Sequence, residues 1–430
     1  MIAGRATLYD DVSHRVARVL MIRRNIALII LLVIGLAAPA GAEVAPHQKP
    51  DIAVFDEVWR LVDRHFYDPD FRGQDWKTLR EHYRPLAEAA PDKDAQAKVI
   101  SDMLAELGAS HTARYRQDDP AYYQLVDIFS GSLRRELRGL FPNGVRYPGI
   151  GLFTRKIDGK LFVSGTIAGL PAEKAGVLVG DEIVDVDGKA FEAVGSFEGK
   201  VGETVIMHVR RAAGGDLLPI EMRPVWIEPA DDLESAMSDG ARIIESGGRK
   251  IGYVRIWSYA GSRYQDQLEQ LLSGKLADAD ALIWDLRDGW GGAQPYYLDI
   301  FSKLGPTMAL TDRDGDHEFV NVKWRRPVAL LINEGSRSGK EVLAYGFKKY
   351  QVGEVIGTRT AGALLAGRAY LLDDDSLLLL AVTNVAVDGE RLERVGVAPT
   401  IEVPFPLEYA AGNDPQIDKA VEVLTRQIGG

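Results

Sequence analysis

Two serines lie on a short turn between an apolar run and a helix-forming segment. Residues 335–346 read G-S-R-S-G-K-E-V-L-A-Y-G and follow residues 327–332, whose length and apolar character predict a buried strand. Ser336 and Ser338 therefore stand at the start of a predicted helix. Free backbone N–H groups and the helix dipole at such a place suit a nucleophile whose attack creates an oxyanion. The alternative is that either serine only caps the helix, which is the commoner role.

A histidine in a polar turn is a candidate base. Residues 99–107 carry apolar side chains at helical spacing, and Gly108 marks the end of this predicted helix. Ser110 and His111 follow directly. Imidazole can accept a proton near neutral pH. Taken alone, however, a histidine just past a helix end is more often a surface residue or a partner of the helix C-terminus.

A pair of glycines follows another predicted strand. Residues 281–285 read A-L-I-W-D, and the chain continues as L-R-D-G-W to Gly291 and Gly292, before a helical run from Pro295. Glycines between a strand and a helix let backbone N–H groups point at a ligand. Such pairs also occur in plain tight turns, so this pair alone does not identify a site.

Residues 148–229 read as a compact β-rich module. It contains a D-G hairpin turn at residues 158–159, a P-A-E-K-A-G-V segment, and G-D-E-I-V-D-V-D-G at residues 180–188. This order resembles a PDZ domain, a fold that binds a peptide as an added strand and holds its terminal carboxylate with loop N–H groups. The resemblance assigns that loop to four residues: Gly149, Ile150, Gly151 and Leu152. The alternative is a purely structural module.

These motifs occur in one fixed order from about residue 52 to residue 405. A helical segment ending in S-H precedes the PDZ-like module, which is followed by D-L-R with a glycine pair and then by S-R-S-G-K-E. The order resembles that of the tail-specific, or C-terminal-processing, serine proteases of family S41 and their tricorn-like relatives. The resemblance implies a nucleophile three residues before Glu341, which is Ser338 and not Ser336.

That family has two catalytic versions, and this chain matches the second. The first uses a Ser-Lys dyad with its lysine in a T-x-G-K segment, but Ala363 occupies the lysine position here. Lys340 is no substitute, because two positions along a helix from Ser338 its side chain points to another face. The tricorn-like version uses a histidine from the helical segment. The resemblance then implies four catalytic residues: Ser338 as nucleophile, His111 as general base, and Ser110 and Glu393 as the residues that orient the imidazole.

The resemblance also implies an oxyanion hole next to the nucleophile. Three backbone N–H groups are its candidate donors: those of Gly339, Gly291 and, as the nearby alternative, Gly292. Asp288 stands where the family usually has an asparagine, so the sequence leaves the shape of this loop open. Asp285 and Arg287 of the D-L-R motif are interpreted as structural supports.

The predicted fold class is α/β with several domains. The resemblance implies a helical cap, a PDZ domain and a protease core of the ClpP/crotonase-like type. The predicted divisions are an N-terminal extension with a signal peptide at 1–42, the cap at 51–117, the PDZ domain at 148–229, the core at 240–410 and a C-terminal helix at 411–430. Residues 118–147 are expected to be irregular, and Pro85 is expected to break the helical pattern.

The composition excludes several classes of function. The 430 residues include no cysteine, which excludes disulfides, thiol catalysis and cysteine-based zinc sites. The seven histidines form no H-E-x-x-H pair, and the net charge of −11 without a basic block argues against nucleic acid as a partner. We expect no cofactor and no metal. The expected partners are polypeptide substrates, with the C-terminus as one route of recognition, and the oligomeric state is not indicated.

A targeting segment is visible near the start of the chain. The basic M-I-R-R at residues 21–24, the apolar residues 26–36 and A-G-A at residues 40–42 predict a signal peptide of about residues 21–42. Met21 is then the candidate true start, and the protein is expected in the periplasm or cell envelope. The alternative is an uncleaved membrane anchor, although the apolar run is short of the roughly 20 residues that spanning requires.

Together the motifs predict an exported serine endopeptidase that cleaves polypeptides through an acyl-enzyme. The alternative is a non-catalytic peptide- or ligand-binding protein on the same fold, which would use its PDZ domain, because a fold alone does not establish catalysis.

Overall fold

The computed structural model describes residues 50–429 except positions 303, 307, 312, 314 and 316. The predicted signal peptide and the rest of the N-terminal extension, residues 1–42, lie outside the described residues. Among the helices that the structure describes, none is both long enough and apolar enough to cross a membrane.

A mostly parallel sheet carries the turn with the two serines. Its six strands are β9 (Arg242–Ser246), β10 (Arg249–Arg255), β11 (Ala281–Asp285), β14 (Val328–Ile332), β15 (Glu354–Gly357) and β18 (Ile401–Glu402). They lie in the order β18-β15-β14-β11-β10-β9, and β9 at one edge runs antiparallel to β10. Strands β11 and β14 are buried at every position. They read as unbroken apolar runs because helices cover both faces of the sheet.

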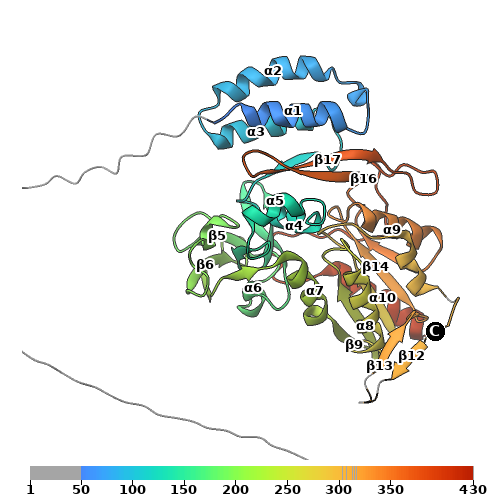
Figure 1. Cartoon of the computed structure of the whole chain (residues 1–430). Coiled ribbons are helices and arrows are strands. Elements are labelled where there is room, and N and C mark those ends of the chain that lie inside the picture. Colours follow the sequence, from blue (N-terminus) through green and yellow to red (C-terminus); the bar gives the residue numbers. More distant parts are fainter. Residues whose placement is uncertain are drawn as a thin grey trace, which may run out of the picture. The chain divides into compact units, whose positions relative to one another are not determined.

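Helices form a layer on each face of this sheet (Figure 1). They are α7 (Pro229–Gly240), α8 (Arg263–Ser273), the 3-10 helix η3 (Pro295–Phe301), α9 (Gly339–Lys349) and α10 (Pro415–Gly429). Helix α10 shares an apolar cluster with Ile283 and Leu331, whereas α7, α8 and α9 share another with Trp284 and Leu330. Neighbouring strand residues therefore alternate between the two layers. The α/β fold class is confirmed, and α9 begins directly after Ser338, where the sequence predicted the start of a helix.

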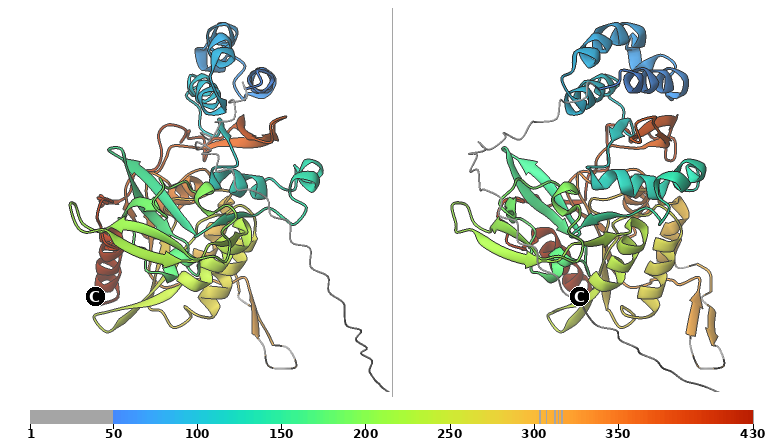
Figure 2. Two further views of the ribbon diagram at one scale, coloured as in Figure 1. Left: turned by 90° about the vertical axis from the view of Figure 1, so that its left-hand side faces the viewer. Right: turned by 60° about the vertical axis from the view of Figure 1, so that its left-hand side comes forward.

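A hairpin and three helices position the segment that carries His111. The elements are α1 (Ala53–His65), the 3-10 turn η1 (Phe71–Gly73), α2 (Trp76–Ala89), α3 (Lys93–Ala105), β1 (Ala113–Tyr115), β16 (Leu365–Leu371) and β17 (Leu377–Asn384). Strand β1 pairs with β17 of the β16–β17 hairpin. The helices pack on this hairpin through a cluster that includes Phe55, Met103 and Leu378, and Figures 1 and 2 show them lying along it. Because β1 begins two residues after His111, this packing fixes the place of the histidine.

The residues predicted to form a PDZ domain fold into a second sheet with its own apolar cluster. The elements are β2 (Tyr147–Gly149), β3 (Leu152–Ile157), β4 (Lys160–Thr166), α6 (Pro171–Lys174), β5 (Glu182–Val186), the 3-10 turn η2 (Gly195–Phe197), β6 (Val205–Arg210), β7 (Leu218–Met222) and β8 (Val225–Ile227). Strands β3 to β7 pair in sequence order, and β2 pairs with β8. Val163, Ile183 and Val209 lie in the cluster of this sheet. Asp158 and Gly159 both have positive φ, as the predicted hairpin turn requires.

Two predictions about the helices are wrong. Residues 118–147 are not irregular, because they contain α4 (Pro120–Ile128) and α5 (Arg134–Leu140). The Asp119 side chain accepts a hydrogen bond from the α4 backbone and Pro120 occupies the first turn, where proline is favourable. Pro85 lies inside α2 instead of ending it. It is solvent-exposed, so water can reach the carbonyl that it leaves without a donor. The strands β12 (Met308–Thr311) and β13 (His317–Val320) were not predicted at all.

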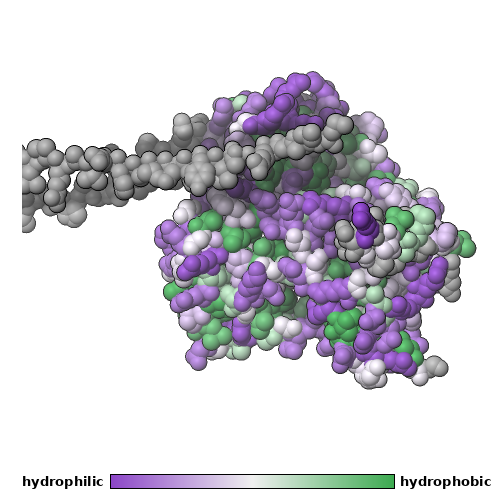
Figure 3. Space-filling model, turned by 60° about the horizontal axis from the view of Figure 1, so that its bottom comes forward, coloured by the Kyte–Doolittle hydropathy of each residue, from purple (hydrophilic) through white to green (hydrophobic). Residues whose placement is uncertain are grey.

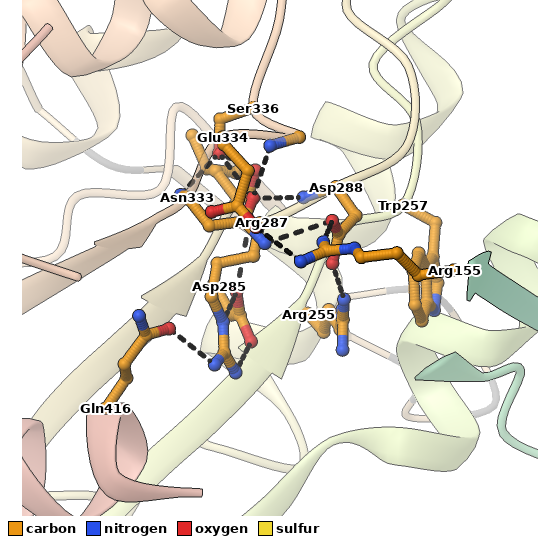
Figure 4. Close-up of polar contacts among 12 residues, drawn as sticks. Arg155, Arg255, Trp257, Asp285, Arg287, Asp288, Asn333, Glu334, Ser336 and Gln416 are labelled. Atoms are coloured by element: carbon orange, nitrogen blue, oxygen red, sulfur yellow. Dashed lines mark hydrogen bonds and ion pairs between the residues drawn. The ribbon is translucent and has the colours of Figure 1, made fainter. Parts of the chain in front are cut away.

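The D-L-R motif forms a buried ion pair at the end of β11. Asp285 is 0% exposed and Arg287 is 3% exposed, and their charged atoms lie 2.6 Å apart. Burial alone would raise the pKa of Asp285, but the charges of Arg287 and Arg255 outweigh it and hold that pKa far below its usual range. Arg287 also donates to Gln416 of α10 at 2.9 Å (Figure 4). The pair therefore joins the core sheet to the C-terminal helix, in keeping with the predicted structural role.

The surface visible in Figure 3 mixes hydrophilic and hydrophobic side chains. Large exposed apolar residues include Trp226, Tyr296 and Leu304, which belong to three different segments of the chain. Single exposed apolar side chains of this kind are usual in globular proteins and assign no function.

Candidate active site

Ser338 occupies the residue before α9 in a backbone conformation that ordinary helix caps do not use. Its φ is 56° and its ψ is −128°, whereas a cap residue normally lies in the β region. A non-glycine residue with positive φ is strained, and strain of this kind clusters at functional sites. Ser338 is half-buried, so its side chain remains accessible at the turn.

Ser336, the other serine of the turn, has a structural role. It is fully buried, and its hydroxyl donates to the Leu286 carbonyl at 2.9 Å while accepting from the Asn333 N–H at 3.0 Å. Both hydrogen-bonding capacities of this hydroxyl are used inside the protein. Ser336 thus links the end of β14 to the D-L-R segment.

The Glu341 carboxylate fastens a separate segment, residues 360–364, to the serine turn. One carboxylate oxygen accepts from the Thr360 hydroxyl at 2.6 Å and the Gly362 N–H at 2.8 Å, and the other accepts from the Ala363 N–H at 2.7 Å. The Ser338 N–H donates to the Ala363 carbonyl at 2.9 Å. From the sequence, Glu341 served only to locate the candidate nucleophile. Its role as a hydrogen-bond acceptor could not be predicted, because its donors lie in a loop about 20 residues away.

Glu393 binds the same segment from the other side. Its Oε2 accepts from the Leu364 N–H at 2.8 Å and from the Ser110 hydroxyl at 2.7 Å, and its Oε1 accepts from the Ser110 N–H at 2.9 Å. Ala363, which contacts Ser338, and Leu364, which contacts Glu393, are adjacent in sequence. The structure therefore brings together Ser338, Glu393 and Ser110 from three distant parts of the chain.

The hydrogen bonds of Ser110 fix the tautomer of His111. The Ser110 hydroxyl lies 3.0 Å from Nδ1 of His111. Since this hydroxyl donates its proton to Glu393, it must accept a proton from Nδ1. The other ring nitrogen, Nε2, is then left with a free lone pair. Burial lowers the pKa of His111 from 6.5 to about 4, so the imidazole is neutral at pH 7 and is equipped to act as a base.

Packing and charge place His111 near the serine turn. A side-chain carbon at Gly367 of β16 would lie 3.3 Å from Cβ and Cδ2 of His111, so the histidine rests on that strand. Arg337, which precedes Ser338, contributes to the lowered pKa of His111 through its charge. Among the described residues no hydrogen bond joins the Ser338 hydroxyl to His111. Such catalytic hydrogen bonds are often long without substrate and tighten when it binds.

The predicted oxyanion donors lie against Ser338, the candidate nucleophile. A side-chain carbon at Gly291 would lie 2.5 Å from Cβ of Ser338 and 2.7 Å from the nitrogen of Gly339, which excludes any larger residue there. The N–H groups of Gly291, Gly292 and Gly339 donate no hydrogen bond within the described part of the chain. Free N–H groups beside a serine hydroxyl can bind a developing oxyanion.

The Asp288 side chain shapes the loop before these glycines (Figure 4). It accepts from Asn333 at 3.0 Å and from Arg255 at 2.9 Å, while its own N–H donates to Asn333 at 2.9 Å. Arg255 in turn stacks over the Trp257 ring at 3.6 Å. An aspartate fits where the family usually has an asparagine, because this chain places an arginine beside it.

Lys340 is a buried cation that the sequence did not assign to the site. It is 0% exposed, and its ammonium donates to the carbonyls of Ile256 at 2.6 Å, Trp257 at 3.3 Å and Asp288 at 2.6 Å. The prediction that it points away from Ser338 agrees with these contacts. The lysine joins α9 to the end of β10 and to the start of the glycine loop. No local pattern could reveal this, because its acceptors lie 52 to 84 positions away.

The predicted carboxylate-binding loop and the serine turn line one pocket. This pocket has a volume of about 580 Å³, and its walls include Gly149 to Leu152 at one side and Trp290 and Arg337 at another. Within the described residues the N–H groups of Ile150 and Gly151 donate no hydrogen bond. They are thus free to bind an acceptor from a ligand.

The described residues contain no cluster of three or more side chains suited to hold a metal ion. The acidic residues 373–375 form the turn between β16 and β17, where Asp374 pairs with Arg114.

We expect the stability of a Lys340→Met variant to differ from wild type in a pH-dependent way. Burial, with a smaller contribution from Arg255, lowers the pKa of Lys340 from 10.5 to about 7. Between these values the unfolded chain binds more protons than the folded protein. Lys340 therefore makes the folded wild type more stable as the pH rises, by up to about 1.4 kcal/mol per pH unit.

Denaturant unfolding at pH 7 and at pH 10 measures this effect, and the exposed Lys77→Met is the control. From pH 7 to pH 10 the free energy of unfolding of wild type should rise relative to that of Lys340→Met. The difference between wild type and Lys77→Met should stay constant. A constant difference for Lys340→Met as well would contradict the prediction.

Two protein-family models match the chain. The model of peptidase family S41 matches residues 250–403, which contain the core sheet, the glycine pair and the serine turn. The model of the tricorn protease C1 domain matches residues 53–105, which contain α1 to α3.

The similar curated proteins include both a tricorn protease homolog and a carboxyl-terminal-processing protease. A putative tricorn protease homolog 2 from Streptomyces coelicolor is 28% identical over 86% of this chain, which spans 32% of that protein's length. A carboxyl-terminal-processing protease from Synechocystis sp. is 26% identical over 86% of both chains.

Solved structures share the fold. The tricorn protease matches 88% of this chain with a TM-score of 0.52 and 21% identity, over 37% of its own length. Mature CPAF matches 88% of this chain with a TM-score of 0.51 and 14% identity. The two family models lie along the chain in the same order as the motifs, and the matched S41 segment contains the serine turn. Residues 250–403 therefore match peptidase family S41, and the proteins similar to this chain include a C-terminal-processing protease and a tricorn protease homolog.

Proposed function

We propose that this protein is a serine endopeptidase that cleaves polypeptides through an acyl-enzyme, with Ser338 as nucleophile and His111 as general base. The observation that carries the proposal is the hydrogen-bonded series from Glu393 through Ser110 to Nδ1 of His111. It orients the free Nε2 as a proton acceptor close to the strained serine turn. Serine is a weak nucleophile by itself, so the proposal requires such a base.

The chemistry proceeds in two halves. Nε2 of His111 takes the Ser338 proton as Oγ attacks the peptide carbonyl, and the imidazolium then protonates the leaving amine. Glu393 stabilises the imidazolium through Ser110, because its negative charge favours the protonated ring. A water molecule, deprotonated by the same nitrogen, then hydrolyses the acyl-enzyme. The N–H groups of Gly339 and Gly291 bind the oxyanion in both halves.

The PDZ-like sheet supplies a place for the substrate C-terminus. The unpaired N–H groups of Ile150 and Gly151 support this part of the proposal, since a terminal carboxylate needs donors of this kind. The loop and the serine turn line the same pocket, so a bound chain end lies on the way to the nucleophile.

The proposed place of action is outside the cytoplasm, in the periplasm or cell envelope. The basic, apolar and A-x-A segments of residues 21–42 support it.

We expect Ser338→Ala and His111→Ala each to reduce kcat/KM for unstructured peptides by at least about 10³-fold, because nucleophile and base act as one unit. A fluorophosphonate probe should label wild type and should not label Ser338→Ala. Ser336→Ala is the matched control in the same turn, and it should lower stability but keep labelling. Equal labelling of wild type and Ser338→Ala would refute the nucleophile. An absence of labelling in wild type would favour a non-catalytic binder.

We expect the acid limb of kcat/KM to lie near pH 4, because burial lowers the pKa of His111 to about 4 and the base must be unprotonated. Glu393→Gln removes a charge that raises this pKa, so its limb should move to lower pH. Its kcat/KM should also fall on the order of 10²-fold, because the imidazolium loses its counter-charge. Initial rates from pH 3 to pH 8 test both effects. A wild-type limb near 6.5 would contradict them.

We expect a peptide with a free C-terminus to have a KM at least several-fold lower than the same peptide with a C-terminal amide, because loop N–H groups bind the carboxylate. Steady-state kinetics on the pair measures the effect. Equal KM values would remove the loop of Gly149 to Leu152 from substrate binding.

A further inference from the structure

Arg337 brings a positive charge to the wall of the substrate pocket, directly beside the nucleophile. It precedes Ser338 in sequence and lines the pocket of about 580 Å³ together with Trp290 and Gln124. Burial lowers the pKa of His111 and raises the pKa of Tyr115, and in both cases the positive charge of Arg337 acts to lower the pKa. The guanidinium therefore lies within electrostatic reach of the reacting atoms.

No carboxylate pairs with Arg337 within residues 50–429 as described. Its one hydrogen bond runs from Nε to the carbonyl of Gly335, in its own turn, at a long 3.4 Å. The guanidinium carbon also lies 5.3 Å from the centre of the Trp290 ring. Most of the five N–H donors of this group are thus unused.

The acidic residues of the same pocket are already engaged. Glu334 pairs with Arg155 at 2.5 Å, and Asp288 pairs with Arg255 at 2.9 Å. Asp119 accepts from the Ala121 N–H at 2.8 Å at the start of α4. The pocket therefore offers a cation without a counter-charge, while each of these anions has its own partner.

The Trp290 ring holds the guanidinium ready for a ligand. Its indole N–H donates to Gln124 at 2.6 Å and its backbone N–H donates to the Trp257 carbonyl at 2.7 Å, so the ring is fixed at both ends. An arginine stacked on a fixed aromatic ring loses less freedom when it binds. Its planar donors match the two oxygens of a carboxylate.

We propose that Arg337 binds a carboxylate of the polypeptide substrate, so that the enzyme prefers substrates with a negative charge close to the cleaved bond. This rests on the proposed function of the site. The carboxylate has two possible sources with the same chemistry, an acidic side chain near the cleaved bond or the terminal carboxylate of a short tail. A bound carboxylate would also offset the Arg337 charge beside His111 and make the base stronger.

The test uses peptides that differ in one residue. Glutamate, glutamine or lysine is placed in turn at each of three positions on either side of the cleaved bond, and each peptide carries a free or an amidated C-terminus. Wild type, Arg337→Gln and Arg337→Glu are compared. Arg368→Gln is the matched control, because Arg368 also stacks on an aromatic ring, Tyr370, but is exposed and lies outside the pocket.

Wild type and Arg368→Gln should cleave the best glutamate peptide about 10- to 100-fold more efficiently than its glutamine partner, as a charge-assisted hydrogen bond allows. Arg337→Gln should abolish this ratio, and Arg337→Glu should favour lysine. If only the free C-terminus produces the Arg337-dependent preference, the terminal carboxylate is the ligand. An unchanged glutamate preference in Arg337→Gln, or no preference in wild type, would overturn the proposal.

Binding separates this proposal from the proposed function. Fluorescence anisotropy of the same peptides on Ser338→Ala requires no catalysis, and it should show the same charge preference and the same loss when Arg337→Gln is added. A charge preference in binding without any Ser338-dependent cleavage would refute the peptidase and keep the Arg337 site. Cleavage that depends on Ser338 but shows no charge preference would refute the Arg337 site and keep the peptidase.

Discussion

The backbone of Thr360 to Leu364 holds the two halves of the candidate site together. All five of its N–H groups are hydrogen-bonded: the middle three bind Ser336 and Glu341 of the serine turn, and the outer two bind Val397 and Glu393. Because buried backbone donors are costly to leave unpaired, these bonds fix the distance between the turn and Glu393. Glu393 then holds Ser110, and Ser110 sets the orientation of His111. The proposed base and the proposed nucleophile, 227 positions apart, are thus positioned by a segment that contains neither of them.

Buried charges surround this framework, and each one has a defined partner. Glu341 accepts from four donors, Lys340 donates to three carbonyls, and Asp285 pairs with Arg287. Removing one partner of such a group leaves an uncompensated buried charge, which costs several kcal/mol. These interactions therefore make the geometry of the site rigid. The half-buried Arg337 differs from them, since its charge faces the pocket and no carboxylate among the described residues pairs with it.

The order of motifs was enough to predict the α/β fold and the start of a helix after the serine turn, because strands end and helices begin at recognisable turns. The sequence failed where distant contacts decide the structure. Residues 120–140 form helices through an aspartate cap and burial of Tyr122 and Leu125, although prolines and glycines indicated a loop. Lys340 donates hydrogen bonds to three carbonyls that are distant in sequence, and no local sequence pattern identifies these acceptors.

A crystal structure of the protein with a bound peptide boronate shows whether His111 and Ser338 act on the same substrate. We expect boron bonded to Oγ of Ser338, a boronate oxygen within about 3 Å of the N–H groups of Gly339 and Gly291, and Nε2 of His111 within hydrogen-bond distance of the adduct. A boronate bound elsewhere, or an adduct on Ser338 whose oxygen faces solvent with His111 out of reach, would show that the two residues do not act together.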